Sequence, residues 1–308
     1  MKNRFALMVA PLLCALCIAN ASAQPAYPRS FKTQTVATAD GASIFVRSGG
    51  AGPAVVLIHG FGDTGDMWVP LAVELAKTHR VIVPDLRGMG KSSKPAGGYD
   101  KKSQAGDIRA VVTALKQDHA AVVGHDIGTM VAYAYAASYP DKVDKLVVMD
   151  APVPGVAPWD QIILWPALWH FNAGGRDFER LVAGRERIYL DRFWNEFAGT
   201  PSKIDEATRR HYAKLYAQPG AMRASFAQFN AIARTDVADN VALSKAKLTM
   251  PVLAIGGEKS LGENMAVIMR NAATNVQGEV VKGSGHWLME EDPGTTVGLI
   301  GKFLAASQ

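Results

Sequence analysis

The chain has 308 residues, 48% of them hydrophobic, and a formal net charge of +5. This length and apolar content suit one domain with a large core and an insertion. The basic residues form no cluster interleaved with aromatic side chains, so the sequence does not predict nucleic-acid binding.

Residues 1–23 are typical of a signal peptide. A basic start precedes an apolar stretch over 5–18, and Ala21–Ala23 fits a small-residue cleavage site. The apolar stretch is too short for a membrane anchor, so we expect no stable membrane insertion. Cys14 and Cys17 are the only cysteines, so we expect no disulfide, thiol catalysis or cysteine metal site in the mature chain. We expect an exported bacterial protein, periplasmic or secreted.

Alternating strands and helices occupy residues 24–150. An opening antiparallel hairpin is followed by apolar runs that are typical of strands buried on both faces. This alternation predicts a doubly wound, mostly parallel α/β sheet. We expect the hairpin at 31–48, further strands at 53–59, 80–84, 120–125 and 144–150, and helices at 67–78, 103–117 and 127–138.

The alternation stops after residue 150. Residues 151–240 are rich in Trp, Phe, Tyr and Arg and show helical periodicity, which predicts a helical cap inserted into the core. The core resumes over 241–308. We expect cap helices at 178–197, 207–216 and 222–233, strands at 251–256 and 278–281, and a closing helix at 295–306.

The segment Gly124-His125-Asp126-Ile127-Gly128 joins a buried strand to a helix. It has the pattern of a nucleophile elbow, Gly-x-Ser-x-Gly, with Asp126 in place of the serine. A carboxylate at this position attacks carbon and forms an alkyl ester, which water must then hydrolyse. We therefore predict Asp126 as a covalent nucleophile.

His286 lies on a glycine-rich loop after the last strand, where an α/β-hydrolase places its base. Its predicted role is to deprotonate the water that attacks the ester. Two carboxylates are candidates for orienting it. We choose Asp150, at the end of one strand, and keep Glu258, after the next, as the alternative because Ser260 stands where that loop usually carries Asp.

Two backbone N–H groups are expected to form an oxyanion hole. Ile127 follows the nucleophile, and Phe61 follows His59-Gly60 at the end of an earlier strand. Both N–H groups would stabilise the tetrahedral intermediate of ester hydrolysis. We interpret His59 itself as structural.

The cap supplies candidate pocket residues. His170 is either a hydrogen-bonded core histidine or a donor to a leaving oxygen or halide. The aromatic residues near it are either core or pocket lining, and we predict a pocket for a small, apolar substrate. The predicted lining residues are Trp169, Phe171, Phe226 and Phe229.

These motifs together resemble the epoxide hydrolases and dehalogenases of the α/β-hydrolase fold, over nearly the whole mature chain. The exported Cif-type epoxide hydrolases are the most similar group that we can name. In that group a cap histidine takes part in opening the epoxide, which implies the same role for His170. The resemblance also implies a homodimer and an enzyme that needs no cofactor or metal. It is carried by His59–Gly62, Asp85–Gly90, Gly124–Gly128, Asp150–Pro154, Trp169–Phe171, Leu181–Arg187, Ala224–Phe226 and Gly285–Trp287.

The chain departs from the epoxide hydrolases at the second ring-opening donor. A tyrosine is expected there, and our alignment places Phe229, which cannot donate a hydrogen bond. The possible substitutes are Gln228, Asn230, Tyr212 and Tyr216.

Two other functions remain open. A hydrolytic dehalogenase would use the same aspartate and histidine, but fluoroacetate dehalogenases carry Arg where this chain has Ile127 and Trp where it has Phe171. A non-catalytic ligand-binding protein would have kept the scaffold and lost full activation. The sequence favours a cofactor-free epoxide hydrolase that forms a diol.

Overall fold

The computed structural model describes residues 26–306, and in that part of the chain it shows one eight-stranded sheet. The strand order is β1-β2-β4-β3-β5-β6-β7-β8. β2 pairs antiparallel with β1 and β4, and the remaining neighbours are parallel, which confirms the predicted fold class. The strands are β1 (Lys32–Ala37), β2 (Ser43–Gly49), β3 (Ala54–Ile58), β4 (Arg80–Pro84), β5 (Ala120–His125), β6 (Val143–Met149), β7 (Val252–Gly257) and β8 (Val276–Val281).

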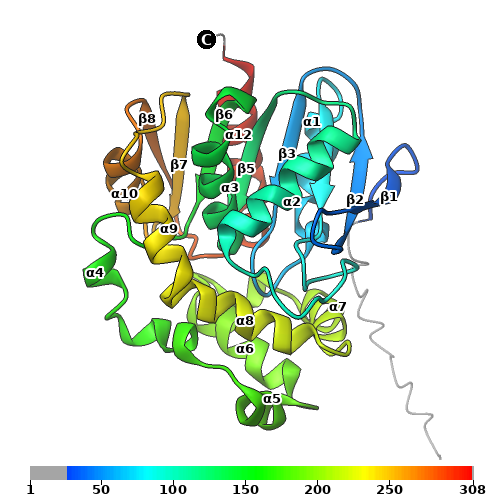
Figure 1. Ribbon diagram of the computed structural model, residues 1–308, viewed down its shortest axis with the longest axis vertical. Coiled ribbons are helices and arrows are strands. Elements are labelled where there is room, and N and C mark those ends of the chain that lie inside the picture. The colour runs from blue at the N-terminus through cyan, green and yellow to red at the C-terminus, as the bar shows by residue number, and fades with distance from the viewer. Residues whose placement is uncertain (1–25, 307–308) are drawn as a thin grey trace, which may run out of the picture.

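Helices cover both faces of this sheet (Figure 1). In β3, Val55 and Leu57 pack into one core while Val56 and Ile58 pack into the other, because alternate side chains of a strand point to opposite faces. Two-sided burial is why the strand is apolar throughout. The core helices are α1 (Val69–Leu75), α2 (Lys101–Ala114), α3 (Ile127–Ser138), α10 (Asn264–Ala272), α11 (Leu288–Glu291) and α12 (Pro293–Ala305).

The predicted cap forms between β6 and β7, and α5 to α8 lie together beyond one end of the sheet (Figure 1). The last cap helix ends at Leu243, a few residues beyond the expected boundary. The cap elements are α4 (Trp159–Ile162), the 3₁₀ helix η3 (Pro166–Asn172), α5 (Arg176–Val182), α6 (Glu186–Glu196), α7 (Glu206–Tyr216), α8 (Ala221–Ala233) and α9 (Thr235–Leu243).

Two predicted helices differ from the structure. The helix expected at 67–78 is a 3₁₀ turn over Gly65–Trp68 followed by the short α1. The helix expected at 178–197 is divided into α5 and α6, and Gly184 between them has φ 75°. That left-handed backbone cannot continue a right-handed helix, and glycine adopts it without steric cost.

A buried ion pair joins the cap to the core. Nζ of Lys101, at the start of α2, lies 2.9 Å from Oδ2 of Asp236 on α9, and the Lys101 N–H donates to Oδ1 at 2.8 Å. Both side chains are 1% exposed. Because a charge sealed from water needs a partner, this pair fixes α9 against α2.

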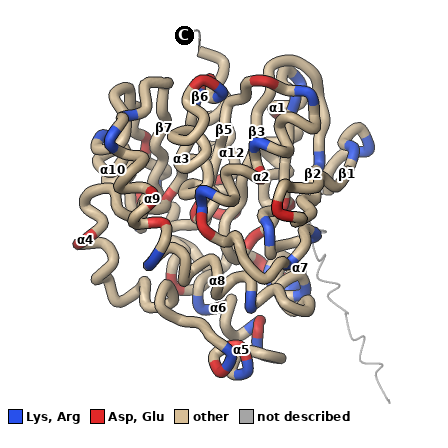
Figure 2. The backbone as a smooth tube through the Cα atoms, in the orientation of Figure 1, with Lys and Arg blue, Asp and Glu red and all other residues tan. Residues whose placement is uncertain are grey.

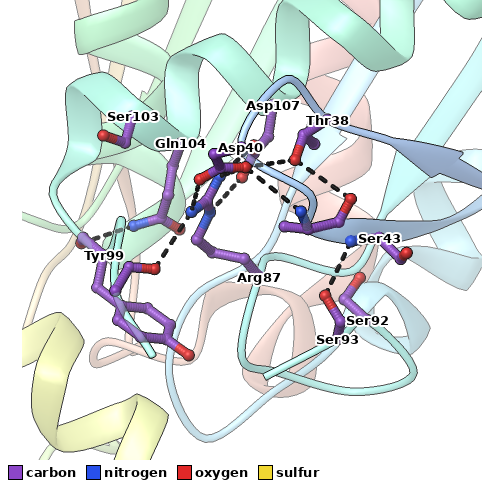
Figure 3. Close-up of polar contacts among 12 residues, drawn as sticks. Thr38, Asp40, Ser43, Arg87, Ser92, Ser93, Tyr99, Ser103, Gln104 and Asp107 are labelled. Carbon is purple, nitrogen blue, oxygen red and sulfur yellow. Dashed lines mark hydrogen bonds and ion pairs between the residues drawn. The ribbon is translucent and has the colours of Figure 1, made fainter. Parts of the chain in front are cut away.

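The loop after β4 makes a second connection between core and cap. The Arg87 guanidinium lies between the carboxylates of Asp107 on α2 and Asp40 in the β1–β2 turn (Figure 3). The Arg87 carbonyl accepts a 3.1 Å hydrogen bond from Nε2 of Gln228 on α8, whose Oε1 accepts another from Gln104 at 2.7 Å. The loop is thereby held by α2 and the β1–β2 turn through the Arg87 side chain, and by α8 of the cap through the Arg87 backbone.

Basic and acidic residues are interspersed along the chain, and α5 carries both signs (Figure 2). Over residues 26–306, none of the helices is long and apolar enough to cross a membrane. The predicted signal peptide, residues 1–23, lies outside the described residues, so export stays a prediction, as does the homodimer.

Candidate active site

Asp126 stands at the tip of a strained turn between β5 and α3, with φ 53° and ψ −123°. Close packing explains the glycines around it. A side chain at Gly124 would collide with the carbonyl of Gly128, and one at Gly128 with the carbonyl of Ile58. Thr129 fixes the turn, because its hydroxyl lies 2.8 and 2.9 Å from the carbonyl oxygens of Gly124 and Met149 and donates its one proton between them. The predicted nucleophile elbow is therefore present.

The Asp126 carboxylate has one contact with the backbone and one with the predicted base. Its Oδ1 accepts a 2.7 Å hydrogen bond from the N–H of Phe61, and its Oδ2 lies 3.5 Å from Nε2 of His286. The Phe61 N–H is thus where the oxyanion-hole prediction requires it. Ile127 begins α3 directly after the nucleophile, and its role as the second donor stays a prediction.

Asp150 is the carboxylate that reaches the base. Its Oδ2 lies 2.9 Å from Nδ1 of His286 and accepts a 2.6 Å hydrogen bond from the hydroxyl of Ser260. Its Oδ1 accepts bonds from the N–H groups of Gly257 and Leu261 at 2.9 and 3.2 Å. These four contacts orient both oxygens of a carboxylate that is only 2% exposed.

The alternative acid, Glu258, and the second histidine of the core motifs, His59, have structural surroundings. Glu258 is exposed and binds the N–H of Gly283 and the Lys282 ammonium. The ring of His59 is buried between the carbonyl of Gly60 and the N–H of Leu86, as expected of a structural residue.

Asp126 and His286 form an ion pair in the resting site. Burial opposes charge on both groups, but their mutual attraction and the Asp150 carboxylate outweigh it. The pKa of Asp126 falls to about 2 and the pKa of His286 rises to about 10. Near neutral pH the site therefore contains carboxylate and imidazolium.

Asp126, Asp150 and His286 all line a cavity of about 220 Å³ between the core and the cap. The cavity wall is mainly apolar. Phe193 on α6 and Phe197, the residue that ends this helix, also lie on the wall and were not predicted to do so. The lining residues include Phe61, Asp126, Met130, Asp150, Ile162, Trp165, Leu168, His170, Phe171, Phe193, Glu196, Phe197, Phe229, Lys259, Leu261 and His286.

Two of the four predicted aromatic lining residues are not on this wall. Trp169 is 44% exposed and packs against the Arg192 guanidinium, on the outer side of η3. Phe226 is buried in a second layer, against the rings of Phe178 and Tyr189. Phe171 and Phe229 line the cavity as predicted.

His170 is 5% exposed and lies on η3, on the cap side of the cavity. Its ring centroid is 4.9 Å from those of both Phe193 and Phe229. Burial and the nearby Arg192 charge lower its pKa to about 4. The structure thus places His170 and Asp126 on the same cavity, as a ring-opening role requires.

None of the four substitutes for the missing tyrosine lies on the cavity wall. Tyr216 is closest to such a role, but its hydroxyl accepts from the Gly62 N–H and donates to the Asp63 carbonyl, behind the Phe61 ring. The Gln228 amide is used in the connection to Arg87. His170 is therefore the one predicted ring-opening donor that reaches the cavity.

Within the described residues, no three His, Cys, Asp or Glu side chains are placed to hold a metal ion. The chemistry that these residues support is nucleophilic attack by a carboxylate followed by base-assisted hydrolysis.

A family model described as the α/β hydrolase fold matches residues 53–293. The chain therefore belongs to the α/β-hydrolase fold family, and its relatives make it a hydrolase similar to epoxide hydrolases. It is 33% identical to a soluble epoxide hydrolase of Corynebacterium sp. (strain C12) over 264 residues, which are 83% of this chain and 91% of that protein.

Two further comparisons bear on the substrate. The epoxide hydrolase CorEH, solved without ligand, superposes with a TM-score of 0.83 at 29% identity, covering 89% of this chain and 99% of that one. A fluoroacetate dehalogenase of Burkholderia sp. is 27% identical over 272 residues, which are 83% of this chain and 88% of that protein. The predicted resemblance to epoxide hydrolases is confirmed, and dehalogenases are also among the relatives.

Proposed function

We propose that this protein is an epoxide hydrolase that converts an apolar epoxide into a vicinal diol through an ester on Asp126. The observation that carries the proposal is the cavity in which the Asp126 carboxylate and His286, paired with Asp150, lie opposite His170. The 33% identity to a soluble epoxide hydrolase supports the choice of substrate.

In the first step, the Asp126 carboxylate attacks the less hindered epoxide carbon. A bond forms between its oxygen and that carbon while the carbon–oxygen bond of the ring breaks. The electron pair remains on the epoxide oxygen, which takes a proton from His170. The low pKa of Asp126, about 2, keeps the nucleophile ionised.

In the second step, water attacks the ester carbonyl and gives a proton to Nε2 of His286. The ester no longer carries the negative charge of Asp126, which is one of the two charges that raise the pKa of His286. Alkylation therefore lowers that pKa and turns an imidazolium into a usable base. The Phe61 N–H stabilises the intermediate oxyanion. On collapse, the bond between the carbonyl carbon and the alkoxy oxygen breaks, that oxygen takes the proton from His286 and leaves as the diol, and the new Asp126 carboxyl gives its proton to His286, which restores the ion pair.

The test is to trap the ester. The protein is incubated with a panel of epoxides and haloalkanes, and diol, halide and protein mass are measured. We expect wild-type protein to form diol and His286→Gln to accumulate an adduct on Asp126. His119→Gln, a change at a half-exposed histidine outside the cavity, should turn over without accumulating it, and Asp126→Asn should form no adduct.

The result decides between three functions. Halide release without diol formation would make the protein a dehalogenase, and the absence of both turnover and adduct would leave a ligand-binding protein. A single turnover in heavy-oxygen water must place the label in Asp126. Label found only in the product would exclude the covalent mechanism.

A further inference from the structure

His170 and Arg192 donate to the same backbone carbonyl. Nδ1 of His170 lies 3.1 Å from the oxygen of Ala167, and Nη2 of Arg192 lies 2.9 Å from it. A carbonyl oxygen only accepts hydrogen bonds, so Nδ1 carries a proton. In the neutral ring Nε2 then holds a lone pair, and it can donate a proton only after the ring becomes an imidazolium.

The Arg192 guanidinium has a fixed position beside His170. It stacks over the rings of Phe193 and Phe197 at 5.0 and 5.4 Å, and both of these rings also face His170. The Arg192 side chain is 16% exposed, and its partner Glu196 is 58% exposed. The positive charge is therefore held close to His170 while much of its counter-charge faces water.

The charges around His170 come from several elements. Burial and Arg192 oppose protonation most strongly, His286 opposes it as well, and Asp126 favours it. The remaining charged residues on the same cavity wall are Asp150, Glu196 and Lys259. Among the groups that lower the pKa of His170, Arg192 is the strongest charge and lies outside the predicted Asp126–His286 chemistry.

We propose that Arg192 is a positioning residue for His170. It orients the Ala167 carbonyl that keeps a proton on Nδ1, and its charge opposes protonation of Nε2, so that substrate oxygen receives its proton only from the imidazolium form. This inference rests on the proposed function. In the ring-opening step, the Nε2 proton of the imidazolium passes to the oxygen and leaves neutral His170 with its proton on Nδ1. The proton that His286 loses to solvent once Asp126 is alkylated balances the proton that His170 later regains.

The tautomer assignment has a direct kinetic consequence. Ester formation slows as the pH rises above the His170 pKa, because the imidazolium fraction falls tenfold for each unit. The same low pKa makes the imidazolium a stronger acid toward a developing alkoxide. Arg192 thus makes the His170 imidazolium less abundant but more acidic.

The test uses variants that separate charge from hydrogen bonding. Arg192→Gln keeps an amide donor for the Ala167 carbonyl and removes the charge, whereas Arg192→Lys keeps the charge. Arg187→Gln is the matched control, because Arg187 lies on the same helix and pairs instead with Asp191 and Glu206. The His170 pKa is measured by NMR titration of the ring, assigned with a His170→Asn variant. The rate of ester formation is measured against pH in the His286→Gln background.

We expect Arg192→Gln to raise the His170 pKa by about one unit. Ester formation at pH 7 should become about threefold faster, less than the roughly tenfold gain in imidazolium, because the more abundant donor is a weaker acid. Arg192→Lys and Arg187→Gln should leave both nearly unchanged. Glu196→Gln, a change at a largely exposed residue, should lower the His170 pKa and provides an independent test if Arg192→Gln does not fold.

An unchanged His170 pKa in a folded Arg192→Gln variant would overturn the proposal, as would ring nitrogen shifts that show a proton on Nε2 of neutral His170. If the pKa moves as expected but no epoxide ever forms an ester, the proposed function fails and the role of Arg192 stands. The two failures are therefore distinguishable.

Discussion

The hydroxyl of Ser260 donates a 2.6 Å hydrogen bond to Oδ2 of Asp150, the oxygen that also contacts Nδ1 of His286. Ser260 lies on the loop after β7, which usually carries the acid in this fold. The usual position of the acid and the position used here, Asp150, are therefore in direct contact. The acid can therefore be supplied from either strand end.

This contact predicts that the acid can be moved. Asp150→Asn should slow ester hydrolysis by about 10⁴-fold, as expected when the partner that fixes the histidine tautomer is lost. In the double variant Asp150→Asn/Ser260→Asp, a carboxylate returns beside His286 and part of the rate should recover. Single-turnover hydrolysis of the Asp126 ester measures both. Ser260→Ala is the control and should cost much less, since it removes one donor among four contacts. A double variant no faster than Asp150→Asn would contradict the prediction.

The raised pKa of His286 predicts alkaline loss of stability. Its folded pKa, about 10, exceeds the unfolded value of about 6.5. The stabilisation that this group provides is fully present below the unfolded pKa and disappears as the pH rises through about 10. Urea unfolding from pH 6 to 10.5 measures it. In Asp126→Asn, one of the two charges that raise this pKa is gone, so the pH dependence should be weaker and end at lower pH. Identical slopes in the two proteins would exclude the ion pair.

A hydroxyl at position 229 should accelerate ring opening. Phe229 lines the cavity, and its ring centroid is 4.9 Å from that of His170. Phe229→Tyr adds a donor that is present at every pH below its own ionisation, and positioned proton donation is worth about 10²–10⁴-fold. We expect at least the lower part of this range in the rate of ester formation. Phe171→Tyr places a hydroxyl elsewhere in the same cavity and should give no such gain. Equal effects in the two variants would argue against a specific donor position.

The buried Lys101–Asp236 pair should be costly to break. Asp236→Ala leaves the Lys101 ammonium without its counter-charge at a position that is 1% exposed. Loss of one partner of a buried pair costs about 3–5 kcal/mol of unfolding free energy. Urea denaturation measures the loss. Asp239→Ala, on the same helix but less buried, should change the unfolding free energy by less than about 0.5 kcal/mol. A small effect in both variants would mean that the cap is held by its apolar contacts.

The placement of Asp126, Asp150 and His286 follows from local sequence. Asp126 and Asp150 directly follow the buried strands β5 and β6, and His286 lies on the loop after the more exposed strand β8. Parallel strands bring these ends to one edge of the sheet. Short apolar runs are a strong signal of buried strands. The two glycines add to this signal, because a side chain at Gly124 or Gly128 would collide with the backbone of the turn. The choice of Asp150 depended on Ser260 occupying the usual position of the acid.

The cavity wall could not be predicted in the same way. Phe226 in the second layer and Phe229 on the cavity wall are both buried, so composition did not separate them. Periodicity shows which residues share a helix face, as Phe193 and Phe197 do, but the direction of that face depends on packing between helices. The break at Gly184 had a local signal, a glycine inside a helical pattern.

The cap is tied to the core by buried polar contacts at Lys101 and Arg87. Moving the cap away from the core as one piece would expose these groups. The fold therefore favours a cap that stays in place over one that opens as a hinged lid. Trp165 lies on the cavity wall and is 44% exposed, so this residue marks where the cavity meets the protein surface. Substrate and diol are then expected to enter and leave without a movement of the whole cap.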